Sequence, residues 1–256
     1  MTQQNFRTLE LSNFRTSMQR IVIVGASGFG KEVAWVIERI NRARFEQSAV
    51  PRGNPDDIGT LELQNFRTLE LSIVGFCDDA PDKQEGAFAG YPLLGTLANV
   101  SSAGCGFFCA IGNNRNRQRV TAQAVELGFS PMTVIDPAAV IAPDAVIGAG
   151  SFVGIGSVVS AGARLGKGVI VNLQSCVGHD ATLGDFVQVC PGAHISGGCD
   201  IGEGALLGTH AAIIPLKKMG AWSTLGAGTA ALRDIPDGAT VIRLNELRQI
   251  KTAPEI

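Results

Sequence analysis

A six-residue period runs through the C-terminal half of this sequence and constrains its fold more than any other feature. Beginning at Ile135, every sixth residue is aliphatic for sixteen consecutive positions, ending at Leu225. Four places after each of them stands a small residue, with the single exception of Lys217. Glycine directly follows the aliphatic residue in nine of the sixteen repeats.

This period excludes the two common regular structures for the segment. An α-helix repeats every 3.6 residues and a flat strand every 2, whereas a hexapeptide β-helix uses six residues for each edge of a three-sided coil. We count the aliphatic residue as the first of each hexad. The first and fifth residues are then expected to point into the prism, and glycine is expected to relieve strain at its corners. At Lys217 we expect the coil to bulge.

A small α/β domain is predicted ahead of the repeats. A buried strand at Ile21–Val24 leads through a glycine turn into an amphipathic helix that begins near Gly30. Strands at 72–79 and 107–114 and a helix at 115–127 complete a Rossmann-like parallel sheet. The expected limits are a tail at 1–18, this domain at 19–133 with a mobile insertion at about 43–70, the β-helix at 134–240 and a tail at 241–256.

The octapeptide NFRTLELS occurs twice, at 5–12 and at 65–72, with shorter copies at 13–16 and 60–63. The copies are too scattered to stack as a solenoid. One interpretation is a docking segment. The favoured one is a duplicated insertion with no chemistry of its own, because the two copies lie in unrelated contexts.

The overall charge gives no reason to expect a polyanionic partner. The net charge is −2 with 17% charged residues, so neither nucleic acid nor an anionic membrane is indicated, and an anionic ligand has to be held locally. There is no apolar run long enough for a membrane span and no apolar core of a secretory signal near the N-terminus, so we expect a cytoplasmic protein. Its six cysteines form no CxxC pair and are expected to be reduced core residues.

The turn between the first strand and helix is a candidate phosphate site. Gly25, Gly28 and Gly30 place small residues at a helix N-terminus, where backbone N–H groups attract anions, but the spacing is not the full dinucleotide fingerprint and close packing explains it equally well. Asp78 and Asp79 follow the second strand, where acidic residues meet sugar hydroxyls in such folds, or where they simply end a solvated strand.

The three histidines, His179, His194 and His210, all lie within the repeats. His179 and His210 occupy the third and fourth positions of their hexads and are expected to project outward. His179 is followed by Asp180, which could orient an imidazole acting as general base. Some hexapeptide β-helices, such as the γ-type carbonic anhydrases, hold zinc with three histidines, two of which form a close pair. The separations of fifteen and sixteen residues here disfavour a metal site.

Several motifs, in order and spacing, resemble the family of sugar acetyltransferases that includes sialic acid O-acetyltransferases and the UDP-4-amino-sugar N-acetyltransferase of bacillosamine synthesis. They are GASGFGKEV, VGFCDD, GYPLLG, AIGNN, VGHDATLGDF, PGAHISGG and LGAGTAALRDIPDGA. The resemblance covers the chain from Ile21 to about Asp237. It implies a small Rossmann-like domain followed by a left-handed parallel β-helix, assembled as a homotrimer with active sites between subunits.

The resemblance also implies roles for individual residues. His179 matches the general base of the family and Asp180 its acidic neighbour, while Asn172 falls near the active site. The positions that hold the nucleotide-linked sugar are Ser27, Gly28, Phe29, Asp78, Asp79 and Gly112. Acetyl-CoA would lie along the β-helix against Gln188, Thr209 and Ala227, the last through its backbone.

Three departures from the family pattern bear on the coenzyme site. Gln188 replaces a second histidine that contacts the acetyl donor, although an amide can still donate a hydrogen bond. Asp136 replaces a frequent histidine at the start of the repeats, and the stretch around Arg243-Leu244-Asn245 replaces the usual Gly-Asn-Pro-Ala-Arg close of the coil.

The sequence therefore predicts an acetyl-CoA-dependent acetyltransferase that acts on the amine of a nucleotide-linked amino sugar, with no metal. Three alternatives stay open. One is O-acetylation of a free sugar such as sialic acid, and another is a non-catalytic sugar-nucleotide-binding protein, an alternative that Gln188 and the altered C-terminus keep open. A metal-dependent lyase or hydratase is the third.

Overall fold

The computed structural model describes residues 18–48 and 70–243, and the chain divides into two compact units. The first unit contains the described residues up to Ala110 together with Gln123–Met132. The second contains Ile111–Ala122 and the described chain from Thr133 onward.

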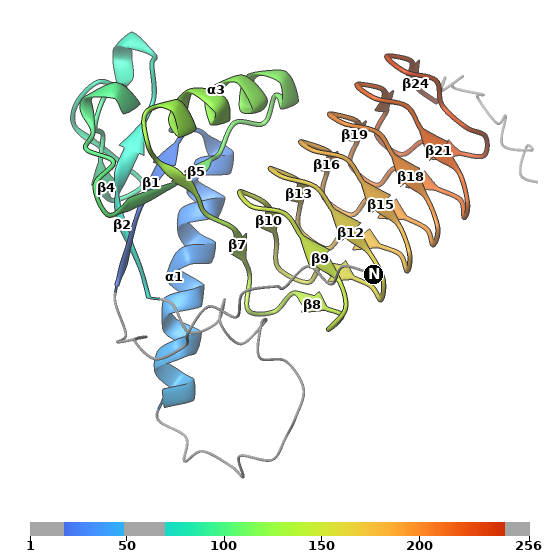
Figure 1. Ribbon diagram of the computed structural model, residues 1–256, viewed down its shortest axis with the longest axis horizontal. Helices are drawn as coiled ribbons and strands as arrows, with labels where there is room; N and C mark the ends of the chain where they lie inside the picture. Colours follow the sequence, from blue (N-terminus) through green and yellow to red (C-terminus); the bar gives the residue numbers. More distant parts are fainter. Residues whose placement is uncertain (1–17, 49–69, 244–256) are drawn as a thin grey trace, which may run out of the picture. The chain divides into compact units, whose positions relative to one another are not determined.

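The first unit is built on a parallel sheet with the strand order β2-β1-β5-β6 (Figure 1). The strands are β1 (Gln19–Val24), β2 (Leu71–Cys77), β5 (Cys105–Cys109) and β6 (Ser130–Pro131). Strand β1 lies between β2 and β5 and is fully buried from Ile21 to Ile23, as expected for a central parallel strand. Short elements η1 (Pro81–Lys83), β3 (Ala87–Phe88), β4 (Tyr91–Pro92) and η2 (Leu97–Asn99) connect β2 to β5.

Two helices follow strands of this sheet. Helix α1 (Gly28–Ser48) buries Val33, Val36, Ile37 and Ile40, whose spacing places them on one face. Helix α3 (Asn114–Glu126) follows β5. The predicted strand–turn–helix unit is confirmed. Of the insertion predicted at about 43–70, residues 43–48 belong to the last turns of α1, and 49–69 lie outside the described residues.

The octapeptide falls mostly outside the described residues. Of its copies only 70–72 are described, and Leu71 and Ser72 there begin β2.

The second unit is a parallel β-helix whose stacked coils are visible in Figure 1. Its first sheet contains β7 (Val134–Ile135), β10 (Phe152–Val153), β13 (Ile170–Val171), β16 (Gln188–Val189), β19 (Leu206–Leu207), β22 (Thr224–Leu225) and β24 (Thr240–Val241). The second sheet contains β8 (Val140–Ile141), β11 (Val158–Val159), β14 (Cys176–Val177), β17 (His194–Ile195), β20 (Ala212–Ile213) and β23 (Ala230–Ala231). The third sheet contains β9 (Val146–Ile147), β12 (Arg164–Leu165), β15 (Thr182–Leu183), β18 (Asp200–Ile201) and β21 (Lys218–Met219).

The side chains that fill the interior of the prism are the ones predicted, those of the first and fifth positions. First-position residues such as Val171, Val189 and Leu207 have no exposed surface, and fifth-position residues such as Ala163 and Ala211 have none either. Burial of one such valine or leucine side chain stabilises the fold by about 1.5–3 kcal/mol. Because each strand pairs with the strand eighteen residues away, identical positions stack from coil to coil.

Glycine recurs at the second and fourth positions of the hexad for two different reasons. The fourth position, not the second, has a left-handed backbone: φ lies between 54° and 73° at all fourteen such residues from Gly150 to Gly228. Second-position glycines instead lie where the next coil passes closely, since a β-carbon on Gly208 would stand 2.5 Å from the nitrogen of Ala227. The expectation that these second-position glycines relieve corner strain is therefore wrong.

The coil does not bulge at Lys217. The carbonyl of Lys217 accepts its regular hydrogen bond from Asp200, and Ile201 pairs with Met219 in unbroken register. The irregularity comes one coil later, where Thr224 pairs with Thr240, sixteen residues away rather than eighteen. The predicted bulge is wrong because the half-buried side chain of Lys217 is accommodated without a change in the backbone ladder.

Four of the six cysteines, Cys77, Cys105, Cys109 and Cys199, are buried as predicted, Cys176 and Cys190 are half-buried, and no disulfide joins them. Within the described ranges, neither helix has the length and apolar character needed to span a membrane.

Candidate active site

His179 and Asp180 form a hydrogen-bonded pair at the corner between the second and third sheets of the β-helix. Nδ1 of His179 lies 2.9 Å from Oδ2 of Asp180. The side chain of His179 points outward as predicted, and so does that of Asp180, with exposed fractions of 71% and 72%. Because Asp180 accepts the Nδ1 proton of the neutral imidazole, Nε2 is left with its lone pair directed away from the carboxylate. This geometry suits a general base.

Asp180, which bonds His179, is the fourth residue of its hexad and has a left-handed backbone, with φ at 58°. Aspartate tolerates this conformation better than most residues, which is one reason it suits the corner. The backbone of His179 is also fixed, since its carbonyl accepts a bond of 2.8 Å from Gly198 in the next coil.

Gln188 is oriented by a buried arginine that sequence reasoning did not identify. Nη1 of Arg117 donates to Oε1 of Gln188 at 3.3 Å, while Nε2 of Gln188 lies 3.7 Å from Sγ of Cys190. A guanidinium has no acceptor atom, so the amide oxygen has to face Arg117 and the amide N–H groups have to face away. Gln188 thus presents a donor, which is the chemistry predicted for its position.

Arg117 is 1% exposed and anchors the loop that carries Gly112 to the β-helix. Its guanidinium donates to the carbonyl oxygens of Ile111 at 3.0 Å and Phe186 at 2.8 Å, and Nε donates to Gly168 at 3.1 Å. Arg117 therefore joins the predicted sugar-binding loop to two consecutive coils. Its sequence neighbours include further arginines, so nothing in the sequence singles it out.

The other two residues predicted to contact acetyl-CoA lie at a different corner of the prism from His179. Thr209 and Ala227 are both exposed and stack in adjacent coils at the corner between the first and second sheets. The carbonyl of Thr209 accepts a bond of 2.9 Å from Gly228. Asn172 is half-buried at the same corner, where its Oδ1 accepts a bond from Leu173. Within one chain, these residues and His179 are separated by the face of the second sheet.

Of the family departures, Asp136 is 1% exposed and its Oδ1 accepts a bond of 2.7 Å from Ala138, so it closes a turn. At the C-terminal departure, Arg243 donates its N–H to Oγ1 of Thr229 at 3.0 Å. Leu244 and Asn245 lie outside the described residues.

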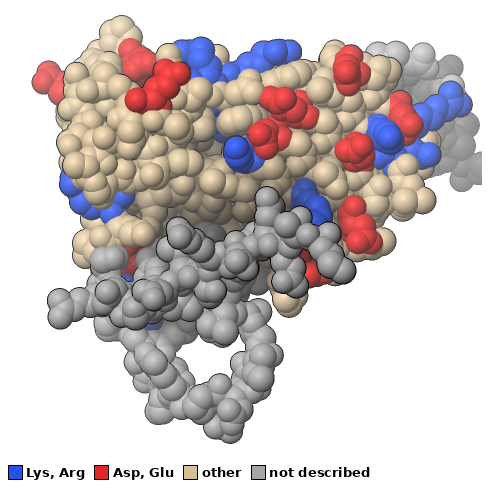
Figure 2. Space-filling model, viewed as in Figure 1, with Lys and Arg blue, Asp and Glu red and all other residues tan. Residues whose placement is uncertain are grey.

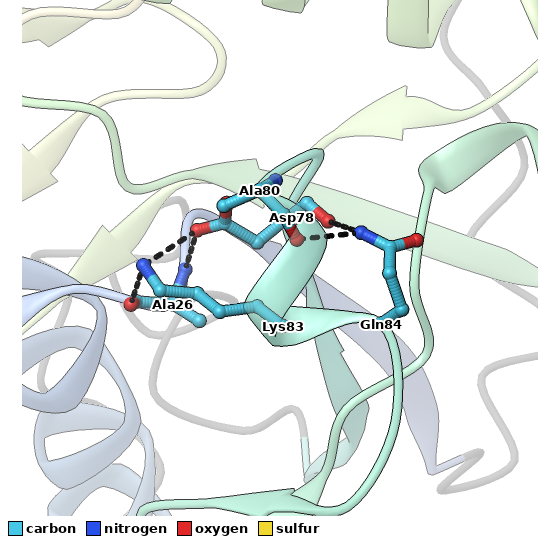
Figure 3. Close-up of polar contacts among 5 residues, drawn as sticks. All are labelled: Ala26, Asp78, Ala80, Lys83 and Gln84. Carbon is cyan, nitrogen blue, oxygen red and sulfur yellow. Dashed lines mark hydrogen bonds and ion pairs between the residues drawn. The ribbon is translucent and has the colours of Figure 1, made fainter.

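The first unit holds a polar network around Asp78, drawn in Figure 3. Oδ2 of Asp78 accepts bonds from the N–H of Ala26 at 2.9 Å and from Nζ of Lys83 at 3.3 Å, and Oδ1 accepts from Ala80 at 3.0 Å. Lys83 also donates to the carbonyl of Ala26 at 2.8 Å. Burial alone would raise the pKa of Asp78, but the bonds from Ala80, Ala26 and Lys83 outweigh it and lower the pKa below its usual value.

This network changes the interpretation of the glycine turn. Asp78 is already bonded within the fold and holds the turn in shape, while Ser27, Gly28 and Asp79 are exposed and Phe29 is half-buried. Close packing explains Gly30, because a β-carbon there would collide with the carbonyl oxygen of Gly25. The exposed residues of the turn are the ones a ligand can reach.

Charge on the surface is mixed. Acidic and basic side chains are interspersed on the face shown in Figure 2, with uncharged residues between them. Among the described residues, no three His, Cys, Asp or Glu side chains gather in the manner of a metal site.

Comparison with known proteins gives a consistent result. Residues 62–124 match the PglD N-terminal domain family. A GDP-perosamine N-acetyltransferase from Escherichia coli O157:H7 is 31% identical over 153 residues, 58% of this chain and 69% of that protein. The acetyltransferase domain of PglB from Neisseria gonorrhoeae, solved with acetyl coenzyme A, is 36% identical with a TM-score of 0.71 over 88% of this chain and 96% of that one. PerB from Caulobacter crescentus, solved with CoA and GDP-perosamine, is 28% identical with a TM-score of 0.71 over 88% and 94%.

Stacked hexapeptide coils and these matches together define a hexapeptide-repeat acyltransferase. The predicted fold class, a Rossmann-like α/β domain followed by a left-handed parallel β-helix, is confirmed. The chain belongs to the hexapeptide-repeat sugar acetyltransferase family, as the sequence motifs predicted.

Proposed function

We propose that this protein transfers the acetyl group of acetyl-CoA to the amine of a nucleotide-linked amino sugar, and that His179 is the general base. The observation that carries the proposal is the bond of 2.9 Å from His179 Nδ1 to Asp180, which leaves Nε2 as the proton acceptor. Relatives that act on or bind GDP-perosamine and CoA support this class of substrates.

The reaction follows from ordinary acyl-transfer chemistry. The sugar amine attacks the thioester carbonyl carbon as Nε2 of His179 takes one of its protons, and the amide N–H groups of Gln188 in a neighbouring copy stabilise the oxyanion. When the C–S bond breaks, the coenzyme thiolate takes the proton from the imidazolium and leaves as the thiol. Burial raises the pKa of the nearby Cys190 thiol, although Gln188 and Arg117 act in the opposite direction, so this cysteine is a poor nucleophile. Direct transfer needs no acyl-enzyme.

A homotrimer with the active site between subunits belongs to this proposal. On the second sheet the outward residues are mostly apolar (Val140, Val158, Cys176, His194, Ala212 and Ala230), whereas three of the five on the third sheet are charged (Val146, Arg164, Thr182, Asp200 and Lys218). A neighbouring copy that covers the second sheet would exclude water from the exposed dyad. It would also bring its own coenzyme edge, with Thr209 and Ala227, beside His179. The use of acetyl-CoA and the absence of disulfides support a cytoplasmic location.

A thiol-release assay tests the reaction. The protein is incubated with acetyl-CoA and a panel of GDP-, UDP- and dTDP-linked amino sugars, with free sialic acid and the matching hydroxyl sugar nucleotides as the O-acetylation arm. We expect stoichiometric thiol release and a mass gain of one acetyl group on an amino sugar nucleotide. Release with sialic acid would establish the O-acetyltransferase alternative, and no release with any acceptor would support the non-catalytic binding protein.

A further inference from the structure

The catalytic pair is flanked by two glycines, one from the coil before it and one from the coil after it. Gly162 precedes Asp180 by eighteen residues, and Gly197 follows His179 by eighteen, so each is stacked directly against one member of the pair. Neither residue has a role in the mechanism described above.

Gly197 leaves the space in which the imidazole of His179 lies. A β-carbon at Gly197 would stand 2.6 Å from Cε1 and 2.8 Å from Cδ2 of His179, and it would be closer still to Nε2. These separations are below the contacts that carbon atoms make in folded proteins, so the ring could not keep its place. The backbone of Gly197 is not left-handed, so conformation does not require a glycine there.

The repeat pattern supports the same conclusion. Gly197 occupies the third position of its hexad, and it is the one glycine at that position in the sixteen repeats. The second-position glycines allow close approach of coils and the fourth-position glycines fit the left-handed corner. Neither the close approach of a coil nor a left-handed backbone explains Gly197. What lies against it is the imidazole of His179, which needs the space that glycine leaves.

Gly162 performs the corresponding task for Asp180. A β-carbon on Gly162 would stand 2.5 Å from Oδ1 of Asp180, the carboxylate oxygen that does not bond to His179. Gly162 is also left-handed, with φ at 69°, so conformation and space both favour glycine. Gly156 also has a left-handed backbone, with φ at 68°, but it has space for a side chain, because a β-carbon there would make an ordinary contact of 3.5 Å with Gln174.

We propose that Gly162 and Gly197 form a socket that fixes the rotamers of Asp180 and His179, so that both glycines are positioning residues for acetyl transfer. This inference rests on the proposed role of His179. A misplacement of a catalytic group by about 1 Å costs on the order of 100-fold in rate. The socket is therefore expected to affect turnover much more than it affects binding of acetyl-CoA.

The test uses G197A and G162A, with G156A as the matched control for a left-handed alanine. We expect kcat to fall about 30- to 100-fold in G197A and about tenfold in G162A, with the Kd for acetyl-CoA within about threefold of wild type. G156A should lose as much thermal stability as G162A but keep kcat within about twofold. If G197A does not fold, the comparison of G162A with G156A still decides the question.

Two further readouts separate positioning from a general structural effect. With ¹⁵N-labelled histidine only three imidazoles are observed, and the His179 signals should shift in G197A and G162A but not in G156A. In an H179A background, G197A should cause no further loss of the residual turnover. Wild-type kcat in both G197A and G162A, with H179A inactive, would overturn the socket alone. Unaltered turnover in H179A would overturn the base assignment and the socket together.

Discussion

Replacement of Asp78 by alanine should destabilise the first unit by about 3 kcal/mol, because it removes three hydrogen bonds from a largely buried carboxylate. The bond from Ala26 joins segments 52 residues apart and is expected to contribute about 1.5 kcal/mol, and the local bond from Ala80 about 1 kcal/mol. Lys83 is 32% exposed, so solvent screening reduces its contribution to about 0.5 kcal/mol.

Two tryptophans make this measurement specific to each unit. Trp35 lies in α1 of the first unit and Trp222 in the β-helix. In a W222F background, urea unfolding followed by fluorescence reports the first unit through Trp35, and D78A should lower its free energy of unfolding by the stated amount. D79A is the control, because the Asp79 side chain next to it is exposed and should leave that free energy unchanged.

The pH dependence has a definite sign. Since the folded-state pKa of Asp78 is lowered, its stabilisation is fully present above the unfolded value of about 3.9 and is lost as the pH falls through the folded value. The difference between wild type and D78A should therefore shrink below about pH 4. Equal stability of D78A and wild type at pH 7 would refute the structural role of Asp78.

The remaining predictions concern the ligands and the assembly. Q188E keeps an acceptor facing Arg117 but removes the amide donor, so kcat/KM for acetyl-CoA should fall about 10- to 100-fold in a folded protein; unchanged kinetics would show that Gln188 does not act as a donor. V158K on the second sheet should dissociate the proposed trimer in sedimentation and abolish turnover, whereas T182K on the third should do neither; a trimeric, active V158K would place the interface elsewhere. D79A should raise KM for the sugar nucleotide several-fold without altering KM for acetyl-CoA, and equal KM values would remove Asp79 from the acceptor site.

The period of six determined most of what could be predicted about the β-helix. It identified the interior positions because burial of aliphatic and small side chains has to recur once per edge. The left-handed fourth position was harder to predict, since Gln174, Asp180, Phe186, His210, Leu216 and Trp222 occupy it without glycine. The residue type at this position therefore does not reveal its φ angle, because neighbouring coils stabilise these non-glycine residues in the left-handed conformation.

The candidate site was predictable where its chemistry is local in the sequence. His179 and Asp180 are adjacent, so their pairing could be anticipated. Arg117 contacts coils 51 to 71 residues away, and only the fold shows which arginine of its helix is buried. The internal bonds of Asp78 were missed for the same reason. Gly197 did leave a signal, as the lone third-position glycine, but its meaning depends on the eighteen-residue coil that places it against His179.

Turnover of H179A, measured beside its affinity for acetyl-CoA, tests the central claim most directly. With the amino sugar nucleotide identified by thiol release, kcat should fall by about 100- to 10,000-fold, while the Kd for acetyl-CoA from calorimetry stays within about threefold of wild type. An H179A protein that turns over at the wild-type rate would contradict the assignment of this imidazole as the general base.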